Sequence, residues 1–155
     1  PGHVRFVAVD FARDDPAGRL LESGYNRDLK TLFIWEGVSY YLSPEAVDKI
    51  LNFVFGYSPR GSSLVFDYFV QMSEDEAAES GTSVKKLDRI AQSAKWQGEP
   101  VLFRMRPEWL REFLFSRGFH MRANVTAQDL KRLYCRQNRP GKLSPHLAIA
   151  RATVS

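Results

Sequence analysis

The chain has 155 residues, of which 44% are hydrophobic and 26% are charged, and its formal net charge is +4. These values are typical of one soluble globular domain with a sizeable core, and they exclude intrinsic disorder and collagen-like repeats. The sequence contains no run of 18 apolar residues, and residues 1–5 lack a signal-peptide pattern, so we expect a cytoplasmic protein without a membrane span. The single cysteine, Cys135, rules out an internal disulfide.

The first 70 residues alternate between strand and helix patterns. The expected elements are, in order, a strand over 4–11, a helix over 15–23, a strand over 31–36, a helix over 43–56 and a strand over 63–69. Proline follows an N-cap residue at the start of both helices, and Gly24 and Gly56 mark their ends. This βαβαβ order with short connections predicts parallel pairing.

The second half of the chain is predicted to begin with a loop that interrupts the alternation of strands and helices. Residues 71–83 are polar and acidic, so we expect a mobile loop there. The expected elements after it are a helix over 84–97, a helix from Pro107 to Gly118, a strand over 120–125, a short helix opened by the capping-box pattern 126–129, and a strand over 146–154. We find no internal repeat, and we expect a single α/β domain over residues 1–155.

Positive charge is concentrated in the C-terminal third. Residues 104–155 hold 11 Lys/Arg against 3 Asp/Glu, whereas residues 1–103 hold 11 against 15. A basic surface could contact nucleic acid or an acidic partner. The basic residues are spread over several expected elements, however, without a zinc-finger, RNP-like or helix-turn-helix pattern. A solvated face is therefore favoured, and we expect no nucleic-acid partner.

Glu36 directly follows the apolar residues 32–35, at the point where a buried strand ends. A carboxylate at this position either finds a partner or faces solvent in a cleft. Open α/β sheets bind their ligands at this carboxyl edge, and Gly37 allows a backbone to approach closely. A cleft is therefore favoured over a structural ion pair with Lys30 or Arg104.

Several other candidate positions remain ambiguous on their residue types alone. Asp10 could cap the loop before the first helix, and Asp67 could cap a helix or face the cleft. Tyr40 and Tyr41 follow Glu36 closely, but such tyrosines are more often core or rim aromatics than catalytic groups. We assign no metal, because the histidines are isolated from cysteines and paired acids: His3, His120 and His146.

Five motifs in collinear order resemble a known family. They are VAVDF (7–11), TLFIWEGVSYYLSPEAV (31–47), GSSLVFDYF (61–69), GEP (98–100) and FLFSRGF (113–119). Together they resemble the class I methyltransferases of the leucine carboxyl methyltransferase family, and the resemblance runs through nearly the whole chain. It implies a Rossmann-like methyltransferase sheet, truncated and mostly parallel with an antiparallel C-terminal strand, which binds S-adenosylmethionine at its carboxyl edge.

The resemblance also implies roles for individual residues. The acid and apolar pair that approaches the adenine falls on Asp10 and Phe11. The glutamate that lines the cofactor cleft falls on Glu36, followed by Gly37. The aromatic pair near the transferred methyl group or the substrate gives the catalytic candidates Tyr40 and Tyr41.

One part of the family pattern is absent. Family members carry, ahead of the VAVDF motif, a helical region with a substrate-facing arginine, a strand with a Gly-rich loop, and an acid that binds the ribose; none of these occurs here. The chain thus resembles the C-terminal half of the enzyme, whose partner would be the missing N-terminal half. Alone, it is expected to be inactive and to bind the cofactor weakly or not at all. We expect the bare strand edges to pair with each other or to form a homodimer.

Two classes of function follow. The first is part of an S-adenosylmethionine-dependent O-methyltransferase that acts on a carboxylate or hydroxyl of a small molecule or peptide. Methyl transfer is an in-line displacement that needs positioning, and a base only if the acceptor is protonated. The second class is a non-catalytic binding or assembly module, which would use the basic C-terminal third or an exposed sheet edge.

Overall fold

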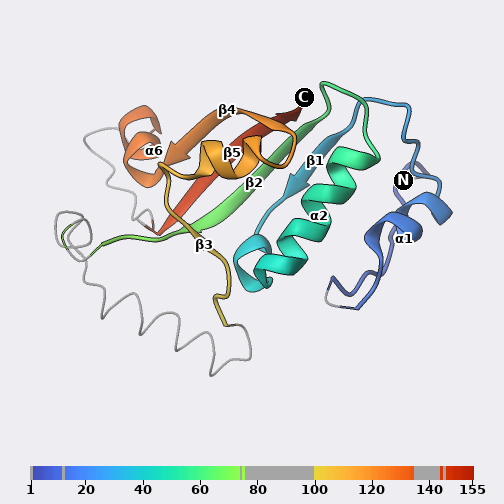
Figure 1. Ribbon diagram of the computed structural model, residues 1–155, viewed down its shortest axis with the longest axis horizontal. Coiled ribbons are helices and arrows are strands. Elements are labelled where there is room, and N and C mark those ends of the chain that lie inside the picture. The colour runs from blue at the N-terminus through green and yellow to red at the C-terminus, as the bar shows by residue number, and fades with distance from the viewer. Residues whose placement is uncertain (1, 12, 74, 76–99, 135–143, 145) are drawn as a thin grey trace.

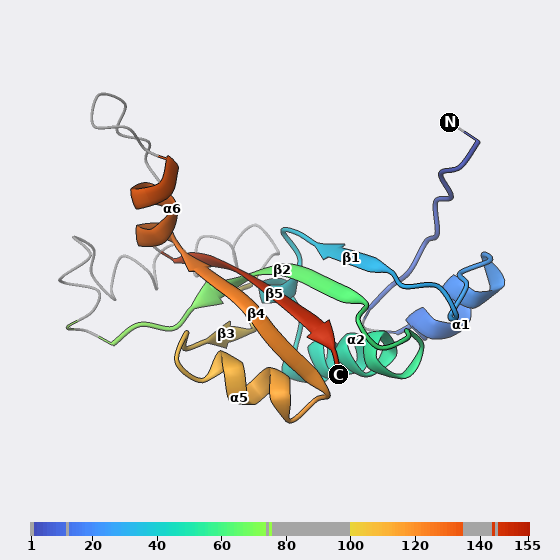
Figure 2. The ribbon, with the colours of Figure 1, turned by 90° about the horizontal axis from the view of Figure 1, so that it is seen from above.

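The computed structural model describes residues 2–11, 13–73, 75, 100–134, 144 and 146–155. Its elements are α1 (Pro16–Glu22), β1 (Leu32–Trp35), the 3-10 helix η1 (Ser39–Tyr41), α2 (Pro44–Gly56), β2 (Ser63–Val70), β3 (Arg104–Met105), α5 (Leu110–Phe115), β4 (Phe119–Thr126), α6 (Ala127–Tyr134) and β5 (Leu147–Val154). The strands form one open sheet, with α2 and α5 packed on the same face (Figure 1, Figure 2).

Strand β2 lies at the centre of the sheet. It pairs in parallel with β1 and β3 and antiparallel with β5, which in turn pairs antiparallel with β4. Because β5 alone is reversed among these strands and lies between β2 and β4, the other four point in the same direction. The strand directions therefore agree with the expected sheet, in which most strands are parallel and the C-terminal strand is antiparallel. Counted by pairings, two of the four are antiparallel.

The helices α1, α2 and α6 begin where their capping residues predict them. The Asp15 carboxylate accepts two amides of the first turn of α1, both at 3.1 Å. The Ser43 hydroxyl accepts an amide of the first turn of α2 at 3.3 Å. Thr126 and Asp129 form the predicted capping box before α6, in which the Asp129 carboxylate accepts the Thr126 amide at 3.0 Å. Each such cap contributes about 1 kcal/mol to helix stability.

The core lies between the sheet and the helices α2 and α5. The apolar side of α2 is buried, and Leu51 and Val54 are each only 1% exposed. Tyr68 on β2 is fully buried, and its hydroxyl donates to Asn124 Oδ1 on β4 at 3.0 Å. The opposite face of the sheet is different: Ile34 on β1 is 70% exposed and Ile149 on β5 is 40% exposed. Among the described helices, α6 rises on that side, at the end of β4 (Figure 2).

The strand prediction for residues 4–11 is wrong. Described residues of this segment form no strand, and Phe6 is 97% exposed. Apolar residues make a strand only when a neighbour pairs with their backbone groups, and none of the described strands pairs with this segment. The expectation that residues 4–11 and 31–36 pair side by side is wrong for the same reason, whereas the homodimer stays a prediction.

Two further differences concern short elements and a helix start, and two predictions cannot be compared with the structure. The short elements η1 and β3 were not predicted, because three and two residues show no periodic pattern. The helix expected from Pro107 begins three residues later, at Leu110. The helix expected over 84–97 and most of the loop expected over 71–83 lie outside the described residues. The single-domain organisation over 1–155 stays a prediction.

Gly118, which ends the turn between α5 and β4, provides a test of this fold. Its φ is +84°, and a Cβ at this position would overlap the ring of Phe55. We expect Gly118→Ala to lower the free energy of unfolding by at least about 1 kcal/mol, the cost of the left-handed backbone alone. Urea unfolding measures this change.

Gly56 provides the matched control. It lies at the end of α2, its φ is not positive, and a Cβ there would meet no atom within 4 Å. Gly56→Ala should therefore leave the free energy of unfolding unchanged or raise it slightly. Equal losses in the two variants would contradict the structure of the α5–β4 turn.

Candidate functional site

The chain leaves the sheet at the end of β1 in a turn formed by Glu36 and Gly37. Trp35, the last residue of β1, is buried on the core side, whereas Glu36 is exposed. Gly37 has a φ of +72°, and a Cβ there would meet no atom within 4 Å. The glycine is therefore required by the backbone conformation of the turn and not by lack of space.

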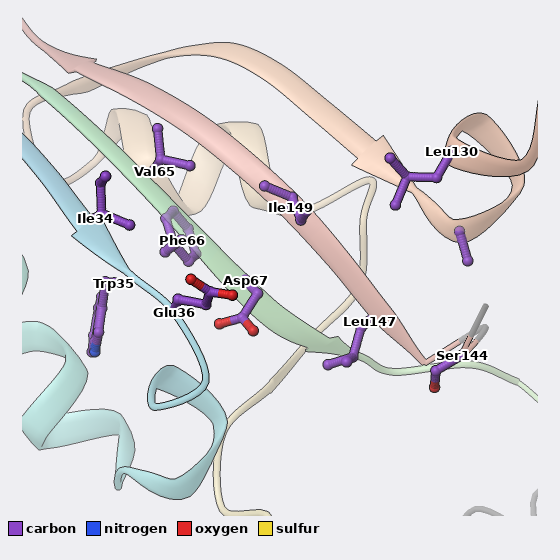
Figure 3. Close-up of a pocket in the computed structure, with 11 residues that line it drawn as sticks. Ile34, Trp35, Glu36, Val65, Phe66, Asp67, Leu130, Ser144, Leu147 and Ile149 are labelled. Carbon is purple, nitrogen blue, oxygen red and sulfur yellow. The ribbon is translucent and has the colours of Figure 1, made fainter. Parts of the chain in front are cut away.

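Asp67 on the neighbouring strand β2 holds this turn. Its carboxylate accepts the Gly37 amide at 3.0 Å through Oδ1 and at 3.1 Å through Oδ2. The Ser39 hydroxyl donates to the Asp67 backbone carbonyl, so the residue after the turn is also tied to β2. In Figure 3 the carboxyl group of Glu36, directly after β1, lies next to that of Asp67 in β2.

The surroundings of Asp67 change its protonation. Burial raises the pKa of the Asp67 carboxyl above the ordinary value of an aspartate, the Gly37 amide counteracts this rise, and the negative charge of Glu36 adds to it. Titratable groups with a raised pKa in a cleft are candidates for functional residues. Among the described residues, no group of three or more His, Cys, Asp or Glu side chains could hold a metal ion.

A pocket of about 420 Å³ begins at these two acids and extends over the open face of the sheet. Its wall is largely apolar and comes from β1, β2, β5 and α6, with Ile34, Val65, Leu130, Leu147 and Ile149 (Figure 3). A pocket of this size, with an apolar wall and a few polar groups at one end, can bind a small organic molecule. The acids would face hydrogen-bond donors or positive charge of that molecule.

Tyr40 and Tyr41 lie in η1, directly after the turn. Their ring centroids are 4.5 Å apart, and both residues are partly buried. The Tyr40 carbonyl accepts the amides of residues 102 and 103, at 2.8 and 3.2 Å, which fixes η1 against the chain segment before β3. Neither tyrosine is among the residues that line the pocket.

Asp10 and Phe11 lie in the loop before α1. The Asp10 carbonyl accepts the amides of Arg13 and Asp14, at 3.0 and 2.7 Å, as expected of a residue that caps this loop. Phe11 packs against the hydrophobic core. Of the residues predicted to bind the cofactor, Glu36 lines the pocket, whereas Gly37, Asp10 and Phe11 are not among its lining residues.

The structure adds Asp67 to the residues predicted from sequence. Its role was ambiguous because the register between β1 and β2 decides which side chain of β2 lies beside the turn. The sequence did contain a pattern that indicates Asp67. An acid also stands near the end of the next predicted strand, and the carboxyl ends of parallel strands lie at the same edge of a sheet.

Comparison with known proteins supports the family resemblance. The family model described as leucine carboxyl methyltransferase matches residues 1–55. The putative S-adenosyl-L-methionine-dependent methyltransferase YktD of Bacillus subtilis (strain 168) is 31% identical over 144 residues, which are 93% of this chain and 45% of that protein. A putative S-adenosyl-L-methionine-dependent methyltransferase of Mycolicibacterium paratuberculosis is 34% identical over 94 residues, which are 61% of this chain and 28% of that protein.

A solved structure shows the same fold. The crystal structure of a DUF574 family protein from Streptomyces avermitilis matches 95% of this chain and 53% of its own, with a TM-score of 0.63 and 16% identity. The chain spans about half the length of this protein and less than half of YktD. None of the described helices is long and apolar enough to span a bilayer. The motifs, the family model over residues 1–55 and YktD all point to the leucine carboxyl methyltransferase family, which this chain resembles.

Proposed function

We propose that this chain is part of an S-adenosylmethionine-dependent O-methyltransferase and forms one wall of its cofactor site. The observation that carries the proposal is the position of Glu36, an exposed carboxylate at the carboxyl end of β1 and at the acidic end of the pocket. Open α/β sheets bind ligands at this edge. YktD, of which this chain matches 45%, is named a putative methyltransferase that depends on this cofactor.

The residues at this edge fit S-adenosylmethionine in chemistry and in size. The cofactor carries hydroxyl and amino donors that a carboxylate such as Glu36 can accept, and the backbone at Gly37 has no side chain to block a close approach. The pocket of about 420 Å³ falls within the range of small-molecule sites. When bound, the cofactor supplies an electrophilic methyl group. The chain's own residues would bind the cofactor and orient it.

The methyl acceptor we propose is a carboxylate or hydroxyl oxygen of a small molecule or peptide. A carboxylate is already a nucleophile, whereas a hydroxyl needs a base nearby. Tyr40 and Tyr41 are the proposed catalytic residues, because η1 follows the turn of Glu36 and the backbone of η1 is fixed by hydrogen bonds. Their hydroxyls would orient the acceptor oxygen toward the methyl group.

The proposed cofactor site also includes Asp10 and Phe11, which do not line the pocket of this chain. We therefore propose that the remaining half of the methyltransferase domain completes the site and brings its own cofactor contacts. A homodimer through the edge of β1 that no described strand pairs with, and a cytoplasmic location, belong to the same proposal. The second class of function, a non-catalytic binding or assembly module, stays an alternative.

Glu36→Gln tests the proposal in the complete methyltransferase domain. We expect this variant to weaken binding of S-adenosylhomocysteine by about 1 to 3 kcal/mol, because a charged hydrogen-bond acceptor is lost from the site. Isothermal titration calorimetry measures the affinity. Glu22→Gln, at an exposed position at the end of α1, is the matched control and should bind as the wild type does. Equal affinities of the two variants would refute the role of Glu36.

The chain of residues 1–155 gives a second test. We expect no heat of binding for S-adenosylmethionine at micromolar protein, because Asp10 and Phe11 lie outside the pocket lining and the sequence holds no Gly-rich loop. Saturable binding with a micromolar dissociation constant would show that the pocket needs no further part of the domain.

A further inference from the structure

We infer that Asp67 is a positioning residue of the proposed cofactor site: its carboxylate clamps the Gly37 amide and thereby fixes Glu36 at the carboxyl edge of the sheet. The link to the cofactor rests on the proposed function of Glu36. The clamp itself is a property of the folded chain and can be tested without a ligand.

The clamp begins where the ladder between β1 and β2 ends. The last pair of that ladder is Trp35 with Phe66. Beyond it, the Gly37 amide donates to both oxygens of the Asp67 side chain, at 3.0 and 3.1 Å. A hydrogen bond to a carboxylate is about twice as strong as one between neutral groups. The Asp67 side chain thus ties β2 to the turn after β1, beyond the last backbone pair of the ladder.

The turn needs such a clamp because of its sequence. Gly37 has a φ of +72° and no side chain, so its backbone could adopt many other conformations if it were not held. Glu36 is exposed and is the residue directly before it. A second tie, from the Ser39 hydroxyl to the Asp67 carbonyl, holds the residue where η1 begins. Asp67 therefore connects Glu36 with the segment that carries the two tyrosines.

The position of Asp67 is unfavourable for a charged group, which argues against a role in stability alone. The carboxylate is partly buried, and the titratable side chain that acts on it from the turn after β1 is Glu36, of the same charge. From β5, its partner in the ladder is the apolar Ile149. Unfavourable charges of this kind are typical of functional sites.

The first experiment tests the clamp in the chain of 155 residues by following the Gly37 amide in a ¹H–¹⁵N NMR titration. We expect the Gly37 amide to shift as Asp67 is protonated, at a pH above the ordinary pKa of an aspartate. The shift should be absent in Asp67→Asn. It should persist in Asp48→Asn, the matched control, which loses a carboxylate that pairs with Arg117 at 2.7 Å. A Gly37 amide that titrates alike in all three proteins would overturn the clamp.

The stability of the same proteins provides a second readout. The folded state binds more protons than the unfolded state between the ordinary pKa of Asp67 and its raised value in the folded chain. The free energy of unfolding of the wild type, relative to Asp67→Asn, should therefore fall as the pH rises through this interval. A difference that does not change with pH would contradict a partly buried Asp67 carboxylate.

The last experiment tests the link to the cofactor in the complete domain. We expect Asp67→Ala to weaken S-adenosylhomocysteine binding about tenfold, the effect of losing a hydrogen bond to a charged group. Asp67→Asn should weaken it less, because an amide oxygen can still accept one hydrogen bond. Asp48→Asn should bind as the wild type does.

The outcomes separate the two proposals. If Glu36→Gln weakens binding and both Asp67 variants bind as the wild type does, the positioning role of Asp67 is overturned and the proposed function stands. If neither the Glu36 nor the Asp67 variants change binding, the cofactor does not use this edge, and a titrating Gly37 amide would then report a clamp that serves only the fold.

Discussion

Strand β2 is the element on which the described structure depends, because it pairs along both of its edges. β1 and β3 pair with it in parallel, and β5 pairs with it in the opposite direction and connects β4. The same strand buries Leu64, Phe66 and Tyr68 in the core. Since β1 is parallel to β2 and ends opposite Phe66, the turn after β1 lies beside the next residue of β2, Asp67. That is where Glu36 and Asp67 come together.

Much of the fold could be predicted from local patterns. The helices α1 and α2 begin after capping residues followed by proline, and the turn before β4 ends in a glycine with positive φ. The order of the strands in the sheet could not be read from these patterns. Residues 4–11 have the composition of a strand, but a strand also needs a pairing partner, and Phe6 is left almost fully exposed. The two residues of β3 are held by pairing with β2 and carry no pattern of their own.

The candidate site could be predicted only in part. Glu36 was identified from its place after four apolar residues and before a glycine, which is a property of a short segment. The role of Asp67 depends on its hydrogen bond from the Gly37 amide, which is 30 positions away in the sequence. This hydrogen bond is set by the register of two strands, which depends on the whole sheet. The positions of Asp10 and Phe11 relative to the pocket likewise depend on packing between distant segments.

S-adenosylmethionine is proposed to bind at the edge of the sheet formed by the turn after β1. A crystal structure of the complete methyltransferase domain with S-adenosylhomocysteine would locate the ligand. We expect the Glu36 carboxylate to accept a hydrogen bond from the ligand while Asp67 still holds the Gly37 amide. A ligand bound elsewhere, with Glu36 facing solvent and making no contact to it, would refute this site.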